Sequence, residues 1–334
     1  MAQLTHLSQH FVLPHGKQGR GLWYVPYPHD ITPASKGKLP CKWHICFHGG
    51  EAIIDLRTAD TVLLYGASDT CLPLAFFHAA ADHHVSISIQ RAHATPIQSL
   101  IPGSSADRND ILSKQIRVRD DGRRSLFVAR TLVVAKHESQ AWLRSTGYRT
   151  GVAEARKAKT LAALRIVEAA QARRYFRSLF PDSSRRDSVE GECLDAAVLL
   201  LRGVIRRWIL AHHLSPHHGF LHEPTTYESL VFDLVEPYRA WAEQSVHACA
   251  ASRKKLTPKN VIEDLKLRLD EVVFCVPTRQ WVRRMAFLQG AVLALRAYLT
   301  GDMLRLILPF EGEPGSGRPY KTSYRLAGEL SDPR

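Results

Sequence analysis

The chain has 334 residues, of which 45% are hydrophobic, and it carries 45 Lys plus Arg against 32 Asp plus Glu, a net charge of +13. This length fits two ordinary domains, and so many apolar residues exclude disorder over most of the chain. No apolar run approaches the roughly 18 residues that span a bilayer, and residues 1–17 lack the pattern of a signal peptide. We therefore expect a cytoplasmic protein with no membrane partner.

The first hundred residues have the pattern of short strands. Strands are predicted at residues 43–47, 52–56, 62–64 and 85–89, and a single helix at 72–83. Residues 102–110 are rich in Pro, Gly, Ser and Asp, which is typical of a linker. The sequence therefore predicts a small β-rich N-terminal domain over residues 1–110.

Four potential zinc ligands crowd together within this domain. They are Cys41, His44, Cys46 and His48. However, Trp43, Ile45 and Phe47 alternate with polar positions, and a half-buried strand explains that alternation without any metal. Zinc sites also usually carry a second, more distant pair of ligands. We therefore prefer the strand to the zinc site.

Beyond residue 110 the apolar residues recur three and four positions apart, as in helices. Helices are predicted at residues 124–144, 155–180, 193–212, 226–251, 257–274 and 278–299. The fold class expected is thus α+β, with a larger all-α domain over residues 111–310. Residues 311–334 contain several Pro and Gly residues, so we expect them to form a flexible C-terminal tail.

The positive charge is concentrated in the helical part. Residues 1–110 hold eight Lys plus Arg and eight Asp plus Glu, so the whole excess lies beyond residue 110. Paired cations occur there at 123–124, 173–174, 185–186, 206–207, 254–255 and 283–284. Such a domain attracts polyanions, and counterion release from nucleic acid favours binding. The alternative is a solvated helical surface without a ligand, and we favour nucleic acid.

Several acidic residues are candidates for metal binding, either because they lie on an apolar helical face or because they lie near a histidine. Glu168 falls on the apolar stripe of its helix, where a carboxylate needs a cation. That cation is a metal ion or an arginine, unless the phase of the helix leaves Glu168 at the surface. His222 precedes Asp233 and Glu236, which share one helical face. A mixed nitrogen and oxygen set suits Mn²⁺ or Mg²⁺, whereas the bland alternative is solvated acids beside a histidine-rich loop.

Two segments resemble the signature of a known family. Residues 214–222 read LSPHHGFLH and residues 229–239 read SLVFDLVEPYR. They are similar to the Pro-x-x-Gly-Phe-Leu-His and Ser-Leu-x-x-Asp-Leu-x-Glu-Pro-x-Arg motifs of the CRISPR adaptation integrases, the larger of the two universal proteins that insert new spacers. Residues 168–176 (EAAQARRYF) resemble the helix with the family's first acidic ligand, with Ala169 where glycine is common. Weaker similarity covers residues 72–89, 126–140 and 306–310.

The resemblance implies a metal-dependent DNA endonuclease and integrase. Glu168, His222 and Glu236 match the family's catalytic ligands for Mg²⁺ or Mn²⁺, and Asp233 matches a supporting acid. The enzyme would join the 3′-hydroxyl of prespacer DNA to the CRISPR leader-repeat by transesterification. Candidate DNA contacts are Arg173, Arg174, Arg206, Arg207, Arg283 and Arg284.

The resemblance further implies a homodimer formed through the N-terminal domain, a small ferredoxin-like partner protein, and two dimers in each integration complex. Two other functions stay open at this stage. One is a mobile-element integrase or a general metal-dependent nuclease of the same fold. The other, from a different class, is a noncatalytic DNA-binding scaffold whose acidic residues form only salt bridges.

Overall fold

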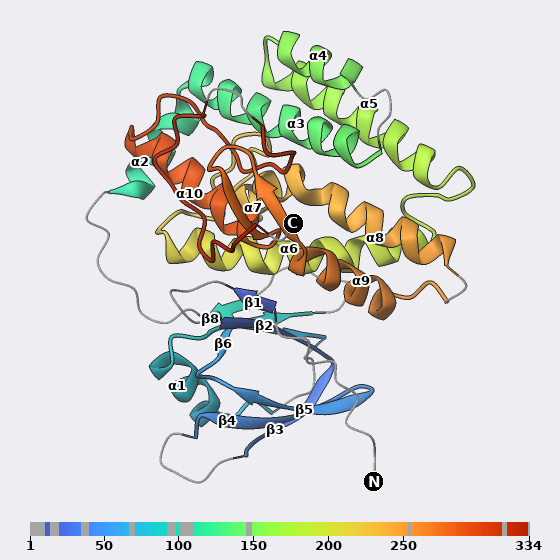
Figure 1. Cartoon of the computed structure of the whole chain (residues 1–334), viewed down its shortest axis with the longest axis vertical. Coiled ribbons are helices and arrows are strands. Elements are labelled where there is room, and N and C mark those ends of the chain that lie inside the picture. The colour runs from blue at the N-terminus through green and yellow to red at the C-terminus, as the bar shows by residue number, and fades with distance from the viewer. Residues whose placement is uncertain are drawn as a thin grey trace. The chain divides into compact units, whose positions relative to one another are not determined.

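The computed structural model describes residues 11–13, 20–34, 40–66, 71–91, 98–100, 110–144, 149–252, 255–315 and 319–332. The chain divides into two compact units, Met1–Ala106 and Asp107–Arg334 (Figure 1). The first unit is built mainly of strands and the second mainly of helices. The expected combination of helices with small sheets is therefore confirmed.

The described residues of the first unit form two sheets and one helix. A five-stranded sheet has the order β1 (Phe11–Leu13), β2 (Arg20–Pro26), β6 (Ala59–Tyr65), β7 (Ser86–Gln90) and β8 (Gln98–Leu100). A three-stranded antiparallel sheet has the order β3 (Pro28–Pro33), β4 (Lys42–Phe47) and β5 (Gly50–Asp55). Helix α1 (Leu74–Asp82) precedes β7.

Both sheets and α1 contribute to a single core in this unit. The outer positions of β4 face away from that core, while Trp43, Ile45 and Phe47 are buried in it. The Trp43 ring contacts the edge of Phe76 from α1, with 5.2 Å between ring centroids. Strand β6 runs parallel to β2 and β7, and its residues 62–64 are completely buried. Such continuous burial is typical of a strand that is covered on both faces.

The strands at residues 43–47, 52–56, 62–64 and 85–89 and the helix at 72–83 match β4, β5, β6, β7 and α1 to within a few residues. Strands β1, β2, β3 and β8 were not expected. Strand β3 begins and ends with Pro28 and Pro33, and it lies at the edge of its sheet. An edge strand tolerates prolines because one of its sides needs no hydrogen-bond donors.

The second unit is a helical assembly. Its helices are α2 (Ile111–Asp120), α3 (Gly122–Arg144), α4 (Arg149–Lys157), α5 (Leu161–Leu179), α6 (Val189–Ala211), α7 (Ser229–Val235), α8 (Arg239–Ala251), α9 (Pro258–Asp270) and α10 (Ala286–Thr300), with a 3₁₀ turn η1 at Glu236–Tyr238. Helix α6 is largely buried and contacts α7, α8, α9 and α10 (Figure 1). Among the described residues, no helix is long and apolar enough to cross a membrane.

The expectation of an all-α second domain is wrong at one place. Strands β9 (Val272–Cys275) and β10 (Gln280–Arg283) form an antiparallel hairpin between α9 and α10. The sequence analysis had instead assigned most of these residues to the predicted helices at 257–274 and 278–299. The sequence VVFC is rich in β-branched and aromatic residues, which favour a strand once a partner lies alongside.

The expectation of a flexible tail is also wrong for the described part of residues 311–334. Tyr324 and Leu326 are buried, and Tyr324 donates a hydrogen bond to the carbonyl of Ile307 at 2.7 Å. Gln280 exchanges hydrogen bonds with the backbone of Leu326, and Leu330 pairs with β10. Proline and glycine here prevent regular structure without preventing packing.

Candidate active site in the helical unit

The loop that precedes α7 is folded around a single buried carboxylate. Asp233 on α7 has no exposed surface. One of its oxygens accepts hydrogen bonds from the backbone N–H groups of Phe220 at 2.5 Å and Leu221 at 2.9 Å. The other oxygen accepts from the N–H of His222 at 3.0 Å. Because a buried carboxylate must be hydrogen-bonded, this arrangement fixes the loop and its histidine together.

The same carboxylate orients the imidazole of His222. Nδ1 of His222 lies 2.7 Å from Asp233 Oδ1, so Nδ1 carries the proton in this contact and Nε2 is left to act as a ligand. Burial lowers the pKa of His222, but the hydrogen bond to Asp233 and the nearby charges of Glu236 and Glu168 outweigh burial and raise it. His222 is therefore held in one orientation in an acidic environment.

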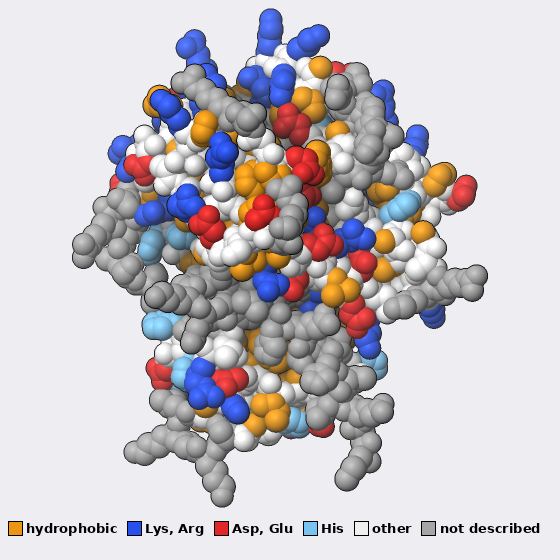
Figure 2. Space-filling view, viewed as in Figure 1, with side chains coloured by type: hydrophobic (Ala, Val, Ile, Leu, Met, Phe, Trp, Pro, Cys, Tyr) orange, Lys and Arg blue, Asp and Glu red, His pale blue; other side chains and the backbone are white. Residues whose placement is uncertain are grey.

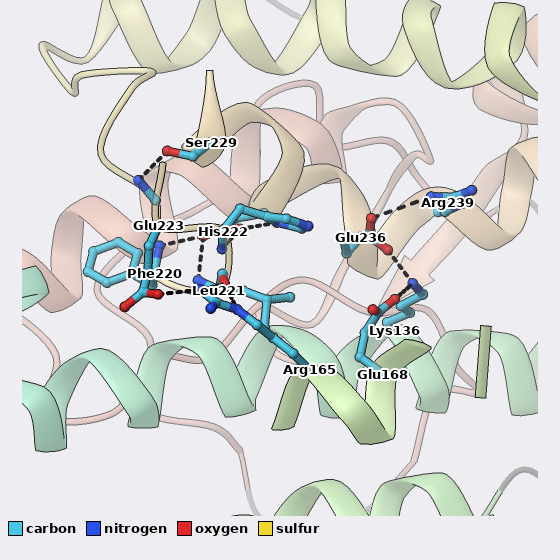
Figure 3. Close-up of polar contacts among 12 residues, drawn as sticks. Lys136, Arg165, Glu168, Phe220, Leu221, His222, Glu223, Ser229, Glu236 and Arg239 are labelled. Atoms are coloured by element: carbon cyan, nitrogen blue, oxygen red, sulfur yellow. Dashed lines mark hydrogen bonds and ion pairs between the residues drawn. The ribbon is translucent and has the colours of Figure 1, made fainter. Parts of the chain in front are cut away.

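Other side chains attach this loop to neighbouring helices. Ser229 Oγ accepts from Gly219 N–H and donates to the His217 carbonyl, both at 2.9 Å. Arg165, on α5, donates two hydrogen bonds to the Leu221 carbonyl, at 2.8 and 2.6 Å (Figure 3). Arg165 also pairs with Glu223 at 2.8 Å. Since α5 also carries Glu168, Arg165 links the helix of one candidate ligand to the loop of another.

Two of the candidate carboxylates meet at one buried cation. The ammonium of Lys136, on α3, pairs with Glu168 from α5 and lies 2.5 Å from Glu236 Oε2 at the start of η1 (Figure 3). The side chain of Lys136 is 1% exposed, compared with 20% for Glu168 and 8% for Glu236. Burial lowers the pKa of Lys136, but the two glutamates raise it more, so the side chain remains charged.

Glu236 has a second cationic neighbour. Arg239 Nη1 lies 3.5 Å from Glu236 Oε1, and Arg239 Nε lies 3.2 Å from Glu243. Burial alone would raise the pKa of Glu236, but the charges of Lys136 and Arg239 lower it to about 2. This carboxylate is therefore ionised at neutral pH despite its burial.

The structure thus forms two pairs from the four sequence-predicted residues. Glu168 and Glu236 converge on Lys136, and His222 converges on Asp233. Among the described residues, no hydrogen bond or ion pair joins His222 to either glutamate. The glutamates nevertheless lie close enough to influence the charge of the imidazole, and Figure 3 shows all three side chains in one region.

Two carboxylates and an imidazole are donors that suit a divalent cation, although the donor atoms of Glu168, His222 and Glu236 do not all lie within 4.8 Å of one another. Two carboxylates already share one positive charge in a buried place, where the Lys136 ammonium lies 2.5 Å from Glu236 Oε2. The imidazole carries the carboxylate partner that metal-bound histidines usually have. Glu168, Glu236 and His222 are the residues of this region that could hold such an ion.

The candidate DNA-binding arginines fall into two groups. Arg173 and Arg174 are exposed on α5. In contrast, Arg206 is 2% exposed and pairs with Glu228, and Arg207 is buried over the ring of Trp208. The prediction that Arg206 and Arg207 contact DNA is therefore corrected, because a side chain buried inside the fold cannot face a DNA backbone.

The third predicted pair, at the end of β10, is bound to acidic side chains. Arg284 is largely buried between Glu271 and Glu311, and the half-buried Arg283 pairs with Asp270. Arg284 is therefore corrected to a structural cation, while Arg283 keeps some exposed surface.

Sequence reasoning missed several residues of this region. Lys136 was detectable, because it follows Leu132 and Val133 on the apolar face of α3 in the same way that Glu168 interrupts its own stripe. Arg202 was not. Its guanidinium lies 3.4 Å from the ring centroid of Phe232, which in turn lies beside His222. Burial and the charge of Arg239 lower the pKa of Arg202 to about 10.

The family model for CRISPR associated protein Cas1 matches residues 47–182 and 193–273. These ranges include Glu168, His222, Asp233 and Glu236, and they confirm the family that the two motifs indicated. Comparison with curated proteins gave no match.

Solved structures with a similar fold include a casposase, a Cas1 protein and a multi-protein complex. A casposase bound to integration product has a TM-score of 0.71 and 20% identity, covering 85% of this chain and 92% of that one. A Cas1 protein from Thermotoga maritima has a TM-score of 0.52 and 16% identity, covering 86% and 98%. A Cas6-RT-Cas1–Cas2 complex has a TM-score of 0.66 and 12% identity, covering 88% of this chain and 36% of that one. At these identities, the likeness establishes the fold.

The substitution Gly219→Ala tests how closely the His222 loop is packed. A Cβ at position 219 would lie 2.7 Å from the His222 carbonyl oxygen and 2.8 Å from an Asp233 carboxylate oxygen. We expect the variant to lose about 1–3 kcal/mol of unfolding free energy in urea titrations and to shift the His222 imidazole NMR signals. Gly122→Ala is the control, because a Cβ there meets nothing within 4 Å. Unchanged imidazole signals in Gly219→Ala would contradict the packing.

Proposed function

Because the chain belongs to the CRISPR-associated Cas1 family, whose members are nucleases and integrases that act on DNA, we propose that it is a metal-dependent integrase of CRISPR adaptation. The reaction is a direct transesterification. The 3′-oxygen of a prespacer strand attacks a phosphodiester at the leader-repeat, and the strand that leaves ends in a 3′-hydroxyl. No covalent bond to the protein forms, and water in place of the hydroxyl gives nuclease activity.

The observation that carries this proposal is the meeting of Glu168 and Glu236 at one buried positive charge, next to a histidine fixed by Asp233. Phosphoryl transfer needs alignment and charge neutralisation more than covalent chemistry, so a site of this composition suits it. A noncatalytic scaffold needs neither two carboxylates on one cation nor an imidazole held with Nε2 available.

Glu168, Glu236 and Nε2 of His222 would hold Mg²⁺ or Mn²⁺. When bound, such an ion supplies neutralisation of phosphate charge and a lower pKa for the attacking hydroxyl. The protein's own residues do the rest. Asp233 keeps the imidazole in the required tautomer, Arg165 keeps the loop against α5, and Arg239 balances the charge of Glu236.

DNA would bind along the basic surface formed by α4, α5 and the turn between them. Exposed cations there are Arg156, Lys157, Lys159, Arg173, Arg174 and Arg177. Figure 2 shows blue side chains gathered at the upper edge of this view, where Figure 1 places α3, α4 and α5. Neutralisation of phosphates by these residues would release counterions and favour binding.

The partners proposed are prespacer DNA, leader-repeat DNA and a small ferredoxin-like CRISPR adaptation protein. A similar structure is described as a Cas6-RT-Cas1–Cas2 complex, which supports the second protein. We further propose that residues 1–110 form the dimer interface, that residues 111–310 catalyse the reaction, and that two dimers act together in the cytoplasm.

A second candidate function is integration of a mobile element. The casposase, with a TM-score of 0.71, supports it. The two functions differ in target choice, because an adaptation enzyme should insert next to the leader and a mobile-element enzyme need not.

Glu168→Ala and His222→Ala should each lower strand joining by about 100-fold or more, because each removes a ligand of the ion that stabilises the transition state. The assay uses labelled duplex DNA and a supercoiled plasmid bearing a leader and repeats, with Mg²⁺ or Mn²⁺, with and without the small partner protein. Glu263→Ala is the control, because Glu263 is an exposed acid on α9, outside both the candidate site and the proposed DNA-binding surface. Joining that persists in both site variants would refute the assignment.

Lys136→Met tests whether Lys136 and a metal ion compete for one place. Without the ammonium, Glu168 and Glu236 repel each other, so the variant should melt at lower temperature in chelator and gain more from Mn²⁺ than the unmodified protein does. We expect its Mn²⁺ affinity to rise about tenfold, measured from the dependence of the melting temperature on Mn²⁺ concentration. Lys159→Met, at an exposed position, is the control. Equal Mn²⁺ shifts in all three proteins would contradict the competition.

Arg173→Gln and Arg174→Gln should each weaken DNA binding and reduce the slope of log K against log salt by about one. Fluorescence anisotropy over a range of salt concentrations measures both quantities. Arg57→Gln serves as the control, since Arg57 is exposed but bonded to Asp55 in the first unit. Slopes equal to that of the unmodified protein would place α5 off the DNA path.

A further inference from the structure

The three-stranded sheet of the first unit carries a cluster of metal-binding side chains on its outer face. His44 and Cys46 are two residues apart on β4, so both point away from the core that Trp43 and Ile45 fill. Glu51 on β5 is the direct antiparallel partner of Cys46, so its side chain lies on the same face. Strand pairing therefore brings an imidazole, a thiol and a carboxylate together.

Distances within this group are short. His44 Nε2 lies 2.9 Å from Glu51 Oε2, and His44 Nδ1 lies 3.8 Å from Cys46 Sγ. One donor atom from each residue lies within 4.8 Å of the others, and all three residues are half-buried. In the part of the chain that the structure describes, no other three His, Cys, Asp or Glu residues meet this condition.

We propose that His44, Cys46 and Glu51 bind a zinc ion, with water as the fourth ligand. Tetrahedral zinc has ligand bonds of about 2.0–2.3 Å, which places its donors roughly 3–4 Å apart. Because His44 offers only one of its two ring nitrogens to an ion, the relevant bound is the 4.8 Å within which one donor atom of each residue lies, and the side chains must move closer to reach this spacing. The paired backbones of β4 and β5 hold the three residues in register. A thiolate ligand selects zinc over Mg²⁺, which prefers oxygen.

The charge of the surrounding face favours a cation. Asp30 on β3 is the antiparallel partner of Cys46 on the side opposite Glu51. Two carboxylates therefore flank the sulfur across the sheet. All six cysteines are free, so Cys46 is not engaged in a disulfide.

The zinc site differs from the four-residue cluster visible in the sequence. Cys41 precedes β4, and His48 lies in the turn after it, where its ring contacts Tyr27 at 6.3 Å between centroids. Neither belongs to the group, and Glu51 replaces them. The proposal goes beyond the DNA chemistry proposed above, because its residues lie in the other unit and need no nucleic acid.

Cobalt in place of zinc provides the test. The full chain, freed of metal with chelator, is titrated with Co²⁺ while the absorption spectrum is recorded. We expect the intense near-ultraviolet band of a thiolate-to-cobalt charge transfer, together with the visible bands of tetrahedral cobalt, and their loss when Zn²⁺ is added. An excess of Mg²⁺ should leave the spectrum unchanged, because Mg²⁺ does not compete for a thiolate.

Variants assign the bands to residues. Cys46→Ser should abolish the charge-transfer band, and His44→Gln and Glu51→Gln should each weaken Co²⁺ binding roughly tenfold or more. Cys41→Ser, and the double variant Glu168→Ala with His222→Ala, should keep the band, which separates this site from the candidate active site. Circular dichroism checks that each variant is folded.

The proposal fails if the unmodified protein shows no charge-transfer band at saturating Co²⁺. It also fails if the band survives in Cys46→Ser or disappears in Cys41→Ser. If Cys46→Ser does not fold, retention of full Co²⁺ affinity in folded His44→Gln would overturn the proposal equally.

Discussion

The buried ammonium of Lys136 is the interaction on which the arrangement of the helical unit depends. It joins α3 to α5 through Glu168 and to η1 through Glu236, three elements that are far apart in the sequence. Two carboxylates cannot lie this close inside a fold unless a cation lies between them, because their repulsion and desolvation would force one to take up a proton. The position of each glutamate is therefore set by the charge of Lys136.

Asp233 fixes the position of His222 as Lys136 fixes the positions of the two glutamates. Its carboxylate accepts hydrogen bonds from three backbone N–H groups of the loop and also orients the His222 ring, so the geometry of the loop and the orientation of the imidazole depend on one group. Each candidate ligand is thus supported by an ionic neighbour that is at least as buried as the candidate ligand itself. Such support is what keeps ligands in place before an ion arrives.

The sequence predicted individual residues better than it predicted their partners. Glu168 was identifiable because a carboxylate interrupted the apolar stripe of its helix. The helical periodicity, however, gives no information about which cation pairs with that carboxylate. Periodicity also assigned β9 and β10 to helices, because a run such as VVFC is apolar in either structure. Pairs of adjacent arginines predicted surface charge, yet α6 is so deeply buried that Arg206 lies inside with Glu228. Burial of this kind is decided by the neighbouring helices, which local sequence does not reveal.

The alternation of β4 shows why two interpretations of one segment need not exclude each other. A strand with Trp43 and Ile45 on one face must place His44 and Cys46 on the other, so the pattern that predicts a half-buried strand also gathers the polar residues into a row. Whether such a row can bind an ion depends on the next strand, and Glu51 is opposite Cys46 only because a tight turn fixes the register of β4 and β5. The same principle holds in both units: local pattern selects the face, and long-range pairing completes the set of donors.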